Sequence, residues 1–96
     1  MEEVILSKNF FNKDEIKILE SYDNGKGYVL VYIKLLALSG TDKQLRFKKG
    51  INYGSYVILS ALTNTSTDFI KETLEVLEKL GMIKRVIGTI IFNELL

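Results

Sequence analysis

The sequence contains no cysteine, no histidine and no proline among its 96 residues. Without cysteine and histidine the chain lacks zinc-finger ligands, disulfides, a thiolate nucleophile and the base of a histidine-dependent triad. Because nothing else supplies a nucleophile together with its base, we predict that the protein is not an enzyme and needs no cofactor or metal. Proline-rich linkers, repeats and low-complexity tracts are also absent, which predicts one domain over residues 1–96.

A strong net charge and a long apolar segment are missing as well. The formal net charge is +1, so attraction for nucleic acid must come from local patches. The longest apolar run, residues 28–38, contains Lys34 and is too short to cross a bilayer, and the chain starts with acidic residues where a signal peptide is basic. We therefore expect a cytoplasmic protein without a membrane partner. The hydrophobic fraction of 47 % is enough for a single core.

The strongest pattern lies in residues 62–83, whose middle is typical of one helix. Ser66 is a suitable N-cap, Asp68 falls in the first turn, and Gly81 follows the last apolar residue as a C′ glycine does. One face is predicted to be buried, because its members recur at helical spacing: Ile70, Leu74, Leu77 and Gly81, flanked by Phe69, Thr73, Val76 and Leu80. The opposite face carries charges spaced for i,i+4 pairs, namely Lys71, Glu72, Glu75, Glu78 and Lys79.

The flanking segments predict a larger motif. A short helix is expected over residues 56–62, with polar residues 63–65 as the turn into the long helix. Residues 82–87 and 90–93 are β-prone, and Gly88-Thr89 between them predicts a type II′ hairpin. Residues 44–47 predict a short strand that pairs with it. This order is that of a winged helix, so the expected class is α+β, mainly α: a winged helix-turn-helix with a short three-stranded antiparallel sheet.

The first half of the chain is expected to be helical. Asn12 and Glu15 form an Asn-x-x-Glu capping pattern at the start of a helix from about residue 13 to 21, with Ile16 and Leu19 on its apolar side. The glycine-containing residues 23–27 are expected to end that helix as a turn. Residues 28–38 begin with strand propensity, but their length favours a helix at the centre of the domain or in a subunit interface.

A family resemblance lies in the segment Tyr-Ile-Lys-Leu-Leu-Ala-Leu-Ser at residues 32–39, together with Leu-Arg-Phe at residues 45–47. With Phe-Phe at residues 10–11 and Leu-x-x-Leu-x-x-x-Gly-Met-Ile in the long helix, it resembles the N-terminal domain of bacteriophage replisome organisers, which are related to DnaD-like primosomal proteins. The chain departs from the family at residues 1–6, which lack aromatic residues. The resemblance implies the N-terminal winged-helix domain of a longer replication initiator, which contacts origin DNA and brings in host replication proteins through the full-length protein.

The candidate contacts for double-stranded DNA are Lys43, Arg46, Lys48, Lys49, Thr65, Ser66, Thr67, Lys71, Lys84 and Arg85. The acid-free basic segment 43–49 can track phosphates or be a solvated loop, and both interpretations stay open. The hydroxyls of residues 65–67 can likewise bind a phosphate or only cap the helix. The acidic long helix and the uncharged wing tip oppose strong binding. The tyrosines are expected in the core rather than as base-stacking platforms.

Two functions remain open from the sequence. The first is a DNA-binding domain of a phage-type replication initiator. The alternative is a module for self-association or partner docking in the same replication protein, without direct DNA binding. It is favoured by the acidic long helix and the near-neutral charge, and by the β-prone residues 4–6, whose strand edge can pair with another chain to form a homo-oligomer.

Overall fold

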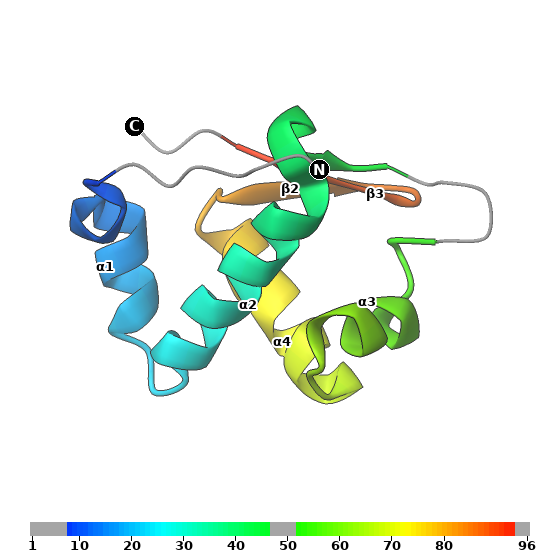
Figure 1. Ribbon diagram of the computed structural model, residues 1–96. Helices are drawn as coiled ribbons and strands as arrows, with labels where there is room; N and C mark the ends of the chain where they lie inside the picture. The colour runs from blue at the N-terminus through cyan, green and yellow to red at the C-terminus, as the bar shows by residue number, and fades with distance from the viewer. Residues whose placement is uncertain (1–7, 47–51, 94–96) are drawn as a thin grey trace.

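The computed structural model describes residues 8–46 and 52–93. They form α1 (Asp14–Glu20), α2 (Gly25–Ser39), β1 (Gln44–Leu45), α3 (Tyr56–Thr63), α4 (Thr67–Lys79), β2 (Ile83–Val86) and β3 (Thr89–Phe92), with 3₁₀ turns at Phe10–Asn12 and Gly40–Asp42. The strands make one antiparallel sheet in the order β1-β3-β2, with α2 in contact with β1 and α4 in contact with β2 (Figure 1). The predicted α+β, mainly α class is confirmed. No helix of the described part is long and apolar enough to span a membrane.

The core lies between α2, α4 and the inner face of the sheet. Its fully buried side chains come from the four α-helices, β1 and β3 and include Ile16, Leu19, Tyr32, Leu35, Leu45, Leu59, Ile70, Leu74, Leu77 and Ile90. The apolar α2 contacts α1, α3, α4 and β1, which confirms its predicted central place. Tyr28, Tyr32 and Tyr53 are buried, as expected of core aromatics.

Both ends of α4 are set by local signals that the sequence displays. At its start the Ser66 Oγ accepts a hydrogen bond from the Phe69 N–H at 3.1 Å. At its end Gly81 has φ +73°, its N–H donates to the Glu78 carbonyl, and the Met82 N–H donates to the Leu77 carbonyl. These two bonds are a Schellman motif. The predicted bounds are confirmed, although Gly81 is exposed rather than buried because it lies beyond the last helical turn.

The predicted capping of the first helix by Asn12 is wrong. Asn12 belongs to the preceding 3₁₀ turn, where its N–H donates to the Asn9 carbonyl, so its backbone does not take the extended form of an N-cap. Lys13, with φ −70° and ψ 141°, occupies that position without a side-chain cap. Beyond the cap the prediction is confirmed, since Ile16 and Leu19 are buried and α1 ends at Glu20.

The expected turn over residues 23–27 is wrong in its second half, because Gly25 and Gly27 lie in the first turn of α2. A Cβ on Gly25 would lie 2.4 Å from the Glu20 carbonyl oxygen and 2.5 Å from that of Leu19. A Cβ on Gly27 would lie 2.8 Å from the Phe69 ring. These glycines therefore allow α2 to approach the end of α1 and the start of α4, rather than reversing the chain.

The hairpin loop is displaced by one residue from its prediction. Val86 pairs with Thr89, so the loop residues are Ile87 and Gly88. Gly88 has a positive φ at the second loop position, whereas a type II′ turn needs it at the first, so the predicted turn type is wrong. Core packing sets this register, because a shift by one residue would turn Ile90 and Phe92 from the core to solvent.

The buried Tyr32 predicts a loss of stability in alkali. Burial, aided by the charge of Glu15, raises its pKa to about 12, whereas an unfolded tyrosine titrates near 10. The folded state therefore keeps a proton that the unfolded state releases. We expect the free energy of unfolding to be unaffected by this group below pH 10 and to fall by up to about 2 kcal/mol between pH 10 and 12. Urea unfolding across this range measures the slope, which Tyr32→Phe should flatten; an unchanged slope would assign it to other groups.

Candidate nucleic-acid interface

The start of α4 carries the polar residues predicted to meet a phosphate. The Thr65 hydroxyl donates to the Thr63 carbonyl at 3.1 Å and its N–H to the Ser60 carbonyl, while the Ser66 hydroxyl caps the helix. Thr67 and Lys71 are exposed, and neither side chain has a partner among the described residues. Thr65 and Ser66 thus shape the turn, and Thr67 and Lys71 remain open to a ligand.

Two acidic side chains of α4 have hydrogen-bond partners on other elements. Glu72 accepts hydrogen bonds from the Tyr28 hydroxyl at 2.6 Å and from the Asn24 amide at 3.2 Å. Glu78 is bound by Arg85. The predicted i,i+4 pairs of Glu75 with lysines do not form, which is consistent with the small gain from exposed ion pairs. Across residues 8–46 and 52–93, no three potential metal ligands come together.

An aromatic contact fixes the start of α4 against α2. The Tyr28 and Phe69 rings are stacked, with centroids 5.3 Å apart, and the hydroxyl of the same tyrosine donates to Glu72. Burial, and then the bond to Glu72, raises the pKa of Tyr28. Sequence reasoning missed this contact, because no local signal links residues so far apart in the chain.

The predicted basic segment lies partly at the outer edge of the sheet. Lys43 is exposed with φ +56°, and its carbonyl accepts the Phe92 N–H. Arg46 is exposed. Its Nε donates a hydrogen bond to Gln44 Oε1 at 2.8 Å and lies 3.7 Å from Asp42 Oδ2. Lys48 and Lys49, like the β-prone residues 4–6, lie outside the described residues.

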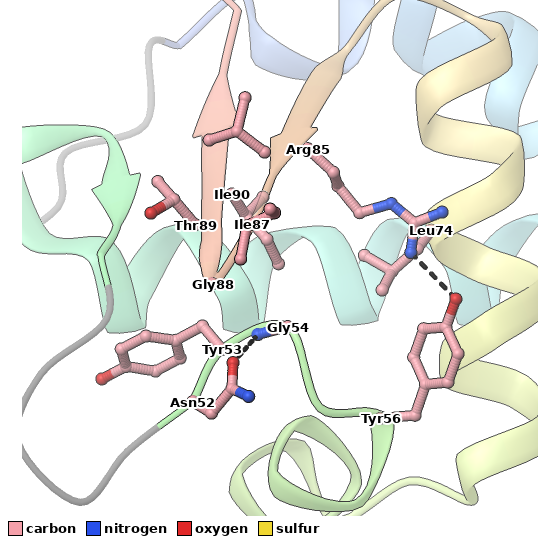
Figure 2. A pocket seen from close by; sticks show the side chains of 11 residues that line it. Asn52, Tyr53, Gly54, Tyr56, Leu74, Arg85, Ile87, Gly88, Thr89 and Ile90 are labelled. Carbon is pink, nitrogen blue, oxygen red and sulfur yellow. Dashed lines mark hydrogen bonds between the residues drawn. The ribbon is translucent and has the colours of Figure 1, made fainter.

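Lys84 and Arg85 are neighbours in β2 with opposite orientations, as side chains alternate along a strand. Lys84 is exposed on the outer face. The Arg85 Nε donates to Glu78 Oε1 at 2.8 Å, and its Nη2 donates to the same oxygen. Its Nη1 donates to the Tyr56 hydroxyl at 3.1 Å (Figure 2). The bond to Glu78 raises the pKa of Arg85. The predicted cation at the base of the wing therefore joins β2 to α3 and α4.

The predicted contacts fall into two groups. Thr65, Ser66, Thr67 and Lys71 lie at the start of α4, whereas Lys43, Arg46, Lys84 and Arg85 lie with the sheet, beyond the other end of that helix (Figure 1). The thirteen residues of α4 separate the groups by about 20 Å. A ligand that touches both must be extended.

Comparison with known proteins agrees with the resemblance in the sequence. Residues 4–95 match the family model described as the N-terminal phage replisome organiser, which covers nearly the whole chain. No curated protein matches the chain significantly, and neither does any solved structure.

Proposed function

The chain belongs to the N-terminal phage replisome organiser family, and we propose that its fold is a winged helix that binds double-stranded DNA during replication initiation. In this proposal α3, the turn and α4 are the helix-turn-helix, α4 enters the major groove, and the β2–β3 hairpin is the wing. Host replication proteins are partners of the full-length protein, and the domain has no catalytic role.

One observation carries the proposal. Two carboxylates of α4 that oppose DNA binding accept hydrogen bonds from other elements. Glu72 accepts one from Tyr28 of α2, and Glu78 accepts one from Arg85 of β2. The start of α4 keeps an exposed Lys71 and an exposed Thr67 beside its free backbone N–H groups. The first turns of α4 therefore offer a cation, a hydroxyl and backbone N–H donors to a phosphate.

The remaining contacts are assigned to the sheet. Lys84 on the outer face and Lys43 and Arg46 at its edge are exposed cations that can reach the DNA backbone. Lys48 and Lys49 continue the same basic segment in the sequence. These residues carry no base-reading role in the proposal, because phosphate contacts position a protein without specifying sequence.

Duplex binding is expected to weaken steeply with salt. If about five phosphates are neutralised, affinity should fall roughly 500-fold between 50 and 200 mM salt. Fluorescence anisotropy of a labelled duplex measures the slope, and the double reversal Lys48→Glu, Lys49→Glu should weaken binding across unrelated sequences. No binding at low salt would refute the proposal, and an unchanged affinity of the double variant would remove the basic segment from the interface.

Self-association is the second candidate function, and exposed apolar side chains favour it. Phe11, Ile18 and Leu30 are each about half exposed, at 53 %, 48 % and 52 %. Large apolar side chains at the surface are typical of sites that another chain covers. Sedimentation equilibrium at high protein concentration distinguishes self-association from DNA binding. A domain that stays monomeric and binds duplex would rule out self-association and leave DNA binding.

A further inference from the structure

A cleft of about 530 Å³ opens between the hairpin, the loop before α3, and α4 (Figure 2). Polar and apolar surface line it in about equal parts, and Tyr53, Leu74 and Ile90 are among its apolar residues. At one end Gly54 lies close to the hairpin tip, since a Cβ on it would be 3.4 Å from the Gly88 nitrogen. The hairpin therefore rests on the loop before α3, and the cleft is formed before any ligand arrives.

Arg85 is the only charged side chain among the described residues that line the cleft. A guanidinium has five N–H donors, and two of those of Arg85 are directed to Glu78 and one to the Tyr56 hydroxyl. One N–H on each terminal nitrogen remains for a ligand. Glu78 is not among the lining residues, so a ligand in the cleft would meet the guanidinium rather than the carboxylate.

Further hydrogen-bond donors surround the same space. The Tyr56 hydroxyl accepts a bond from Arg85, which leaves its own proton to donate. The Asn52 Oδ1 accepts the Gly54 N–H at 2.8 Å, so the NH₂ group of that side chain is the part left for a ligand. Gly54 and Tyr56 flank the N-cap Ser55, which places the positive end of the α3 dipole at the cleft edge. An acceptor-rich anion fits this set of donors.

We propose that the cleft binds a phosphate of the DNA backbone, with Arg85 as the phosphate-binding residue and Glu78 and Tyr56 as the residues that position its guanidinium. This inference rests on the proposed function and names a second contact on the side of the domain away from the start of α4. The planar guanidinium suits a phosphate because two N–H groups can meet two oxygens. The exposed apolar side chain of Ile87 at the hairpin tip supplies a surface for the adjoining deoxyribose.

Substitutions at the cleft test the inference through duplex affinity and its salt slope. Arg85→Gln should weaken binding about 10- to 100-fold and reduce the salt slope by about 0.9. Arg85→Lys keeps the charge but should weaken binding nearly as much as Arg85→Gln does. The reason is that an ammonium cannot bind Glu78, Tyr56 and a phosphate in one plane. Tyr56→Phe should weaken binding about threefold with the slope unchanged, since its role is positional. Lys17→Gln on α1 is the matched loss of one charge and should have a small effect.

Circular dichroism establishes that each variant is folded, and Arg85→Lys and Tyr56→Phe keep the test valid if Arg85→Gln unfolds. The inference is overturned if folded Arg85→Gln and Lys17→Gln lose affinity equally, or if Arg85→Lys binds as the wild type does.

A nuclear magnetic resonance titration of the wild-type chain tests whether the cleft binds a phosphate, independently of duplex binding. A deoxydinucleotide with one phosphodiester, and inorganic phosphate, are the probes. We expect the dinucleotide to shift the Arg85 Nε–H and the Gly54 and Gly88 amides of the wild type, and to leave the two glycine amides unmoved in Arg85→Gln. Shifts with inorganic phosphate alone would mean a small-anion site and overturn the DNA assignment. Duplex binding without shifts at the cleft would refute this inference alone, whereas shifts without duplex binding would refute the proposed function.

Discussion

Replacing Gly25 with alanine is expected to lower the free energy of unfolding by about 2 kcal/mol, although alanine is the better helix former by about 1 kcal/mol. The added Cβ would lie 2.4 and 2.5 Å from two backbone carbonyl oxygens at the end of α1. Backbone atoms cannot rotate away as a side chain can, so α1 must shift relative to α2. That shift disturbs the packing of the fully buried Leu19, and its cost exceeds the gain in helix propensity.

Urea unfolding monitored by circular dichroism measures the loss. Lys26→Ala is the matched control, because Lys26 is exposed in the same turn of α2 and its truncation removes no packing. We expect the control to be within about 0.5 kcal/mol of the wild type. If both variants were equally stable, the end of α1 would be able to move at little cost, and the account of Gly25 as a packing glycine would be wrong.

Reversing Lys71 to glutamate is expected to weaken duplex binding roughly 10- to 30-fold at low salt. Lys71 lies in the second turn of α4, is exposed, and has no ion pair among the described residues, so its charge is available to a phosphate. The substitution both removes a cation and adds an anion beside Asp68, in the part of the helix where the proposal places the DNA. Anisotropy titrations at two salt concentrations measure the loss and its screening.

Lys17→Glu is the control for this reversal. It makes the same change of charge at an exposed residue of α1, a helix to which the proposal assigns no DNA contact. We therefore expect only a few-fold loss there. Equal losses for the two variants would show that net charge, rather than the start of α4, governs binding.

The elements that could be predicted are those whose signals are local. The cap at Ser66 and the glycine at position 81 act within one helical turn, so the bounds of α4 followed from a few neighbouring residues. The nearly all-round apolar character of α2 was likewise enough to place it at the centre. The family resemblance in residues 32–39 also held, since it depends on residue identity rather than on contacts.

The candidate site was predicted less well, because its partners lie far apart in the sequence. Arg85 was expected beside Lys84 at the surface, yet the alternation of strand side chains and the position of Glu78 turn it inward. Glu72 is exposed as expected, but the sequence did not show that its carboxylate accepts a hydrogen bond from Tyr28 of an earlier helix. Sequence periodicity predicts the face of a helix on which a charged residue lies. It does not predict which residue of another element binds that charge.

The sequence by itself determined the class of fold, the long capped helix and the family, because these depend on composition and on patterns within one or two turns. Only the tertiary structure decided how Gly25 and Gly27 are used, which residues form the hairpin loop, and which charges of α4 stay open to a ligand. Each of these depends on distances between elements, and such distances exist only once α1, α2, α4 and the sheet have packed around one core.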